Sequence, residues 1–136
     1  MNRFTLDLRD ARGHEQVDGV TSFIGSDDSG TFGLMAGHER FMTSLRFGLA
    51  RFRVGDDDWE YLAVPGALLY FHDNRLELNT RRYLRDRDYE RISHLLSTQL
   101  AAEEDELAAV RHSLRRLEGE MLRRLWELGR DGRASL

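Results

Sequence analysis

The chain has 136 residues, a mass of 15.8 kDa and a formal net charge of −4. It has no cysteine, and its 20 basic residues are all arginine, which excludes disulfides, cysteine-based metal sites and lysine-based catalysis. The mean hydropathy of −0.56 leaves no apolar run that could cross a bilayer, and no basic footprint marks a nucleic-acid-binding protein. Because the N-terminus also lacks an apolar signal segment, we expect a cytosolic protein without enzymatic activity.

The first 80 residues contain all seven phenylalanines and the one proline, Pro65, and their apolar side chains recur with a period of two. Short alternating runs separated by turn residues predict a β-sandwich or a small barrel. Of the two, we expect a β-sandwich domain over residues 1–82. The run 67–71 is continuously apolar, which predicts a strand covered on both faces. The expected strands are 4–8, 17–24 with a bulge near Gly19, 31–35, 47–54, 59–64, 67–71 and 76–78.

Residues 86–130 have the period of a helix and form the predicted C-terminal helical domain, with Asp86 or Asp88 as the cap. No large apolar residue occurs in 101–106, so we expect a break there and two helices, as a hairpin or an extended arm. The four acidic residues of this segment would suit the N-terminus of the second helix. They would equally suit the solvated face of one unbroken helix.

The second part of this region carries an apolar stripe that needs a partner. Full burial of its seven side chains would contribute roughly 10–20 kcal/mol, which a lone helix in water cannot gain. The stripe must therefore pack on the sandwich, on the other helix or on another protein. Its members are Leu107, Val110, Leu114, Leu117, Met121, Leu125 and Leu128.

Two groups of arginines mark the second half: Arg81, Arg82, Arg85 and Arg87, and then Arg115, Arg116, Arg123 and Arg124. The first group is either a solvated linker or a contact for phosphate or an acidic surface. The second either pairs with glutamates three or four residues away or docks on an acidic partner.

Other clusters favour structural roles. The five histidines lack metal-ligand spacing, so we expect no metal site and place them at the surface or at caps. Segment 25–30 is interpreted as a solvated turn. Segment 30–38 contains three glycines, which predicts close passage of backbone between strands.

The glycine segment resembles one in the epsilon subunit of F-type ATP synthases. The family carries Gly-x-Phe-Gly-hydrophobic-x-Pro-Gly-His inside an N-terminal sandwich. Here Met35 and Ala36 occupy the sixth and seventh positions, with alanine in place of proline. The continuation 41–48 and the order of sandwich and helices also match. The matching positions are Gly30, Phe32, Gly33, Leu34, Gly37 and His38.

This resemblance implies a non-catalytic rotor subunit, peripheral at the cytoplasmic face of a bacterial inner membrane. The sandwich is then expected to bind the gamma subunit, with the loop Gly37, His38, Glu39 and Arg40 facing the c-ring. The helices are expected to restrain ATP hydrolysis, with Arg115, Arg116, Arg123 and Arg124 meeting the catalytic alpha and beta subunits.

Some family members bind ATP through Leu/Ile-Asp-x-x-Arg-Ala, and Asp88 and Arg91 have its spacing. Arg87 stands where the motif has leucine or isoleucine, and Ile92 stands where it has alanine. We therefore expect no cofactor. The alternative is that ATP binds at Asp88 and Arg91. The missing proline and the ending 123–128 also resemble the N-type branch, which leaves both sodium and protons open as the transported ion of the complex. The rival interpretation is a free-standing sandwich adaptor whose amphipathic helical arm binds an unrelated protein.

Overall fold

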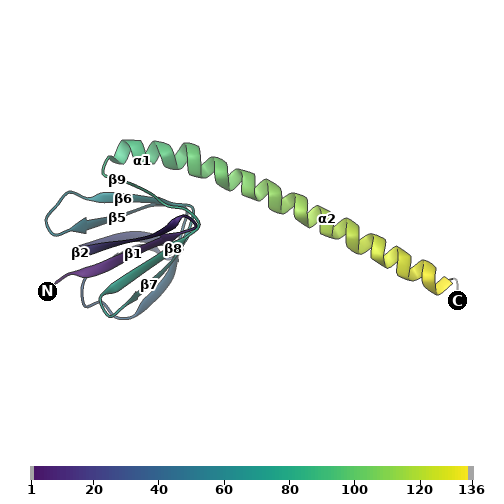
Figure 1. Ribbon diagram of the computed structural model, residues 1–136, viewed down its shortest axis with the longest axis horizontal. Coiled ribbons are helices and arrows are strands. Elements are labelled where there is room, and N and C mark those ends of the chain that lie inside the picture. Colours follow the sequence, from purple (N-terminus) through teal and green to yellow (C-terminus); the bar gives the residue numbers. More distant parts are fainter. Residues whose placement is uncertain (1, 135–136) are drawn as a thin grey trace. The chain divides into compact units, whose positions relative to one another are not determined.

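The computed structural model describes residues 2–134, with side chains described as far as Arg130. It consists of two compact units, the first ending at Ala101 and the second beginning at Ala102. The first unit holds all of the described strands and two short helical segments, and the second is a single long helix (Figure 1). The predicted fold class, an N-terminal β-sandwich followed by a helical region, is confirmed.

The strands of the first unit are β1 (Phe4–Asp10), β2 (Gly13–Asp27), β3 (Gly30–Leu34), β4 (Phe41–Leu45), β5 (Gly48–Val54), β6 (Glu60–Val64), β7 (Ala67–His72), β8 (Arg75–Thr80) and β9 (Leu84–Asp86). The helical segments are α1 (Tyr89–Leu95), the π-helical turn η1 (Leu96–Leu100) and α2 (Ala101–Ala134).

The strands are hydrogen-bonded in the order β4-β7-β8-β1-β2-β5-β6-β9, and β3 pairs with β2. Among the strands that the structure describes, only β1 and β8 run parallel to each other; the other pairs are antiparallel. Strand β2 has 15 residues and joins the two layers, because its first half pairs with β1 and its second half with β3 and β5. The register shifts between Val20 and Ser22, next to Gly19 at φ +73°, so the predicted bulge is confirmed.

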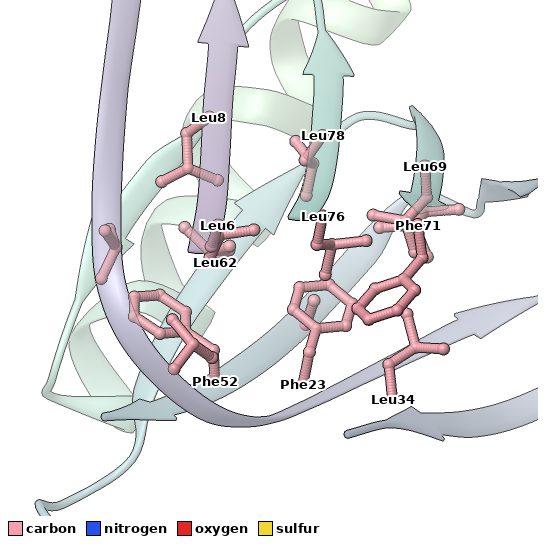
Figure 2. Close-up of a cluster of buried hydrophobic side chains, with 14 of the residues drawn as sticks. Leu6, Leu8, Phe23, Leu34, Phe52, Leu62, Leu69, Phe71, Leu76 and Leu78 are labelled. Carbon is pink, nitrogen blue, oxygen red and sulfur yellow. The ribbon is translucent and has the colours of Figure 1, made fainter. Parts of the chain in front are cut away.

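The core lies between the two layers and follows the period of two. Leu6, Leu8, Leu76 and Leu78 come from the parallel pair β1 and β8 and are fully buried. Figure 2 shows these side chains pointing toward Phe23, Leu34, Phe52 and Leu62, which come from β2, β3, β5 and β6. Every second residue of these strands therefore faces the core.

The prediction that strand 67–71 is covered on both faces is wrong. Leu69 and Phe71 are fully buried, but Leu68 is 47% exposed. The reason is that β7 lies in an antiparallel part of the sheet, where one face can remain open.

The predicted close passage of backbone at the glycines of segment 30–38 is also wrong. A Cβ added to Gly30 or Gly37 would meet nothing within 4 Å, and one at Gly33 would lie 3.9 Å from the nearest atom. Gly30 and Gly37 instead have φ of +123° and +82°. The turns at these positions require such positive φ values, which residues with a side chain rarely adopt.

Strand β9 and the short helical segments extend the first unit beyond residue 82. The fully buried Ile92 and Leu100 pack with Ala63 of β6, and Leu84 and Leu96 flank them. Figure 1 shows α1 next to β9 and β6. The helical segments α1 and η1 therefore cover part of the outer face of the β6 and β9 layer.

The predicted break in 101–106 is wrong, because α2 runs through this segment. Alanine, glutamate and leucine favour helix, and neither glycine nor proline interrupts them. The departure from α-helical geometry lies earlier, in η1, where the hydroxyls of Ser97 and Thr98 donate to the carbonyl of His94. Within the described residues, no helix is long and apolar enough to span a membrane.

Candidate functional site

The loop between β3 and β4 is fixed by two backbone hydrogen bonds. The N–H of Gly37 donates to Asn74 Oδ1 at 2.6 Å, and the N–H of His38 donates to the carbonyl of Met35 at 3.2 Å. The positive φ of Gly37 gives the loop its turn. The loop that the sequence singled out therefore has a defined conformation.

His38 anchors this loop to the sandwich. Its ring lies edge-on to Phe41 and Phe71, with centroid distances of 5.6 and 5.8 Å, and its Nδ1 is 2.8 Å from the carbonyl of Glu39. The side chains of Glu39 and Arg40 are exposed and form no ion pair with any residue in the described part of the chain. They are charged groups of this loop that a partner can reach.

The turn between β7 and β8 supports the loop from the side. Asp73 and Asn74 have φ of +48° and +56°, the geometry of a tight two-residue hairpin. A shallow pocket of about 260 Å³ lies between the loop and the turn; it is lined by Gly37, His38, Arg40, His72, Asp73 and Asn74. The sequence analysis missed the contribution of 72–74, since no local pattern links residues 37 positions apart, such as Gly37 and Asn74.

A second hollow adjoins the loop on the other side of Met35, which is 65% exposed. In this hollow the guanidinium group of Arg53 lies 5.5 Å from the centre of the Trp59 ring. Its lining is Asn2, Arg3, Thr21, Ser22, Met35, Arg53, Gly55, Asp56 and Trp59. The loop surface is thus larger than the four residues that the sequence identified.

Two arginines of the run at residues 81–87, Arg85 and Arg87, bind the carboxylate of Glu60. Arg85 donates to Glu60 from Nε at 2.5 Å and from a terminal nitrogen at 3.2 Å, and Arg87 donates to the same carboxylate at 3.4 Å. The Arg85 hydrogen bonds lower the pKa of Glu60, although burial opposes them. Burial and the hydrogen bond to Glu15 raise the pKa of Tyr83. These contacts hold β9 on the sheet.

Asp88 and Arg91 are engaged at the start of α1. Asp88 is the N-cap, accepting from the backbone N–H groups of Glu90 and Arg91 at 3.1 and 3.2 Å. Arg91 binds Asp86 through two nitrogens at 2.6 and 2.9 Å, and this pair lowers the pKa of Asp86 to about 2. Any nucleotide at these positions has to compete with contacts that stabilise the helix.

In α2 the apolar stripe is exposed to solvent. Val110, Leu114, Leu117, Met121, Leu125 and Leu128 are between 52% and 67% exposed. Arg115, Arg116, Arg123 and Arg124 are exposed as well, and none of them pairs with a carboxylate in the described part of α2. The pairing with neighbouring glutamates is therefore not formed, and a docking role stays a prediction. No group of metal-ligating side chains was found in the described residues.

Three comparisons place this geometry among known proteins. Residues 3–86 match the family ATP synthase, Delta/Epsilon chain, beta-sandwich domain. The chain is 29% identical over 111 residues to ATP synthase epsilon chain 2 of Cereibacter sphaeroides, a match that covers 81% of this chain and 76% of the relative.

Two solved structures share the fold. One is a chain in the mitochondrial ATP synthase of Euglena gracilis, with a TM-score of 0.58, 19% identity and coverage of 71% of this chain and 63% of that chain. The other is in the central stalk and c-ring of the Tetrahymena thermophila mitochondrial ATP synthase, with a TM-score of 0.52, 15% identity and coverage of 62% and 69%. Because the family match spans more than half of the sequence, this chain belongs to the ATP synthase delta/epsilon family, as a subunit of the epsilon type.

Proposed function

We propose that this epsilon-type chain is a non-catalytic subunit of the central stalk of an F-type ATP synthase. It links the gamma subunit to the c-ring and restrains ATP hydrolysis through α2. The observation that carries the proposal is a compact sandwich joined to a separate helix whose apolar stripe is solvent-exposed. Such a stripe contributes to stability only when another surface covers it, and we propose that this surface belongs to another subunit.

The loop Gly37–Arg40 is the proposed contact with the c-ring. Asn74 and the aromatic contacts of His38 fix its backbone, so a load on the loop passes into the core strands. Its exposed Glu39 and Arg40, with Met35 beside them, offer both charge and apolar surface. Gamma is the proposed partner of the sandwich itself.

The helix α2 is the proposed regulatory element. Its arginines Arg115, Arg116, Arg123 and Arg124 have free guanidinium groups that suit carboxylates of the catalytic alpha and beta subunits. No cofactor is assigned to the chain, since Asp88 and Arg91 cap α1 and bind Asp86. The proposed location is peripheral, on the cytoplasmic face of a bacterial inner membrane, through the c-ring.

Affinity purification from native membranes tests this assignment. A tagged full-length chain should bring down gamma and c subunits in fixed proportion. A free-standing adaptor, the alternative function, would purify with an unrelated protein and with neither of these subunits. A Gly37→Ala, Asn74→Ala variant should retain gamma and lose c subunits, because it alters only the loop and the hydrogen bond that holds the loop to the β7–β8 turn.

Charge reversal on α2 tests the regulatory part. Replacing Arg115, Arg116, Arg123 and Arg124 by glutamate should raise ATP hydrolysis by the assembled enzyme several-fold, since attraction to carboxylates becomes repulsion. The effect should shrink at high salt, where exposed charges are screened. Hydrolysis that stays at the wild-type rate at both low and high salt would argue against docking through these arginines.

A further inference from the structure

The hollow next to Met35, whose lining includes Arg3 and Arg53, has a volume of about 550 Å³. We name it the arginine hollow. Its volume falls in the range of small-ligand sites and is about twice the 260 Å³ of the pocket beside Gly37. Segments far apart in the sequence line it, from the residues before β1 to the turn between β5 and β6. The fold therefore gathers distant side chains around one concave surface.

Arg3 carries a charge that no residue in the described part of the chain neutralises. Its side chain takes part in no hydrogen bond or ion pair there. The guanidinium lies against two glycines: a Cβ added to Gly19 would meet Nη1 at 3.3 Å, and one added to Gly55 would meet Nη2 at 3.2 Å. Both glycines have positive φ, +73° and +58°, which other residues rarely adopt. The backbone therefore leaves room for this cation without supplying an anion.

Arg53 is held in place and keeps one nitrogen free. Its Nε donates to the carbonyl of Asp57 at 2.8 Å, and its Nη2 donates to the carbonyl of Asp56 at 3.4 Å. Its Nη1 has no partner among the described residues. The hydroxyl of Thr21 lies 3.2 and 3.0 Å from the carbonyls of Arg53 and Gly55, which ties the turn to β2. A donor that is already ordered loses little entropy when an anion binds.

The charge of the arginine hollow suits a small anion. Asp56 lines the hollow and opposes its two arginines, which leaves a formal charge of +1. The next two residues of the turn are also aspartates, but they lie outside the lining. The guanidinium of Arg51 lies 4.6 Å from the centre of the Trp59 ring and adds positive charge beside the hollow. One small anionic group fits this balance better than a polyanion does.

The free donors of the arginine hollow match the oxygens of a phosphate group. Arginine binds phosphate through parallel, charge-assisted hydrogen bonds. The hydroxyl of Ser22 also lies in the lining and has no hydrogen-bond partner among the described residues. We infer that the arginine hollow binds a phosphate group, with Arg3, Nη1 of Arg53 and the hydroxyl of Ser22 as its donors.

Two sources supply such a group: inorganic phosphate and the headgroup of an anionic phospholipid. The ring of Trp59 and the exposed Met35 form an apolar part of the lining, which would contact the carbon atoms of a phosphate ester. The inference does not depend on the proposed function, because all of these residues belong to the first unit and no partner subunit is needed.

The fluorescence of Trp59 tests the site in the full-length chain. The chain has two tryptophans, so Trp126→Phe leaves Trp59 as the only one. In this background, inorganic phosphate added at constant ionic strength should change the Trp59 emission in a saturable way. Arg3→Ala should weaken binding about tenfold or more, because a charged hydrogen-bond donor is lost. Ser22→Ala should weaken it in the same direction by a smaller factor.

Arg12→Ala is the matched control. Arg12 is an exposed arginine in the turn between β1 and β2, at the other end of β1 from Arg3, so this variant should bind as wild type does. Arg3→Ala and Ser22→Ala should unfold at the wild-type urea concentration, because neither side chain has a partner in the described part of the chain. A loss of binding at unchanged stability is then a property of the site.

Vesicles of phosphatidylglycerol distinguish the two sources. Saturable binding of inorganic phosphate that depends on Arg3 supports the inference, with free phosphate as the ligand. Binding to the vesicles alone, lost with Arg3→Ala and kept with Arg12→Ala, supports it with the lipid headgroup as the ligand. If neither probe binds, or if Arg3→Ala and Arg12→Ala behave alike with both probes, the arginine hollow is not a phosphate site and the inference is overturned.

Discussion

Glu60 connects the last strand of the sheet to its neighbour through two arginines. It is 8% exposed, and its carboxylate accepts from Arg85 at 2.5 Å and from Arg87 at 3.4 Å. Hydrogen bonds to charged groups inside a protein are stronger than those at the surface. The cluster therefore holds β9, from which the chain continues into α1.

We expect Glu60→Gln to lower the free energy of unfolding at pH 7 by about 1–3 kcal/mol, because two arginines lose their anionic acceptor. In the folded protein the pKa of Glu60 lies below the ordinary value of 4.5. Its carboxylate therefore binds a proton less readily in the folded protein than in the unfolded chain. Its contribution is thus complete above about pH 4.5 and is lost as the pH falls through the folded pKa. Urea unfolding of both proteins from pH 7 to pH 3 measures this; a difference that is constant over the range would contradict it.

The loop residues illustrate what a sequence reveals about a site. Gly37 and His38 belong to a local motif and could be identified from it, and the structure gives both a defined conformation. Asn74 and Trp59 could not, because their place beside the loop follows from strand pairing between distant segments. The contacts of Arg85 with Glu60 were missed for the same reason.

At the scale of single strands, β7 offers a matched pair of neighbouring leucines. Leu69 is fully buried and Leu68 is 47% exposed. We expect Leu69→Ala to cost about 2–5 kcal/mol of unfolding free energy and Leu68→Ala less than about 1 kcal/mol. Chemical denaturation of the two variants measures the difference, and equal losses would show that both faces of β7 are covered.

The elements were predictable where one face is buried and the period is clear. Strands such as 4–8 and 47–54 alternate cleanly and form as expected. Strands β4 and β9 were not predicted, because β4 follows a loop motif and β9 has only three residues, two of them charged. The break in 101–106 was inferred from missing apolar side chains, yet helix propensity kept the segment helical.

On the scale of the whole molecule, the two units differ in how they are stabilised. The first has its own core of buried leucines and phenylalanines, including the Ile92 and Leu100 contacts with β6. The second is one helix with a solvent-exposed apolar stripe. A helix of this kind gains most of its stability from a partner, which makes its docking sensitive to small changes in free energy.

The most direct test of the regulatory role of α2 uses a chain shortened to end at Ala101. The quantity to measure is the rate of ATP hydrolysis by the enzyme assembled with this shortened chain. The shortened subunit keeps every buried residue of the first unit, so it should unfold at the same denaturant concentration as the full chain and still assemble. We predict that hydrolysis rises at least several-fold once α2 is gone. A shortened subunit that is folded and present in the complex, with hydrolysis still at the wild-type rate, would contradict the restraint by α2.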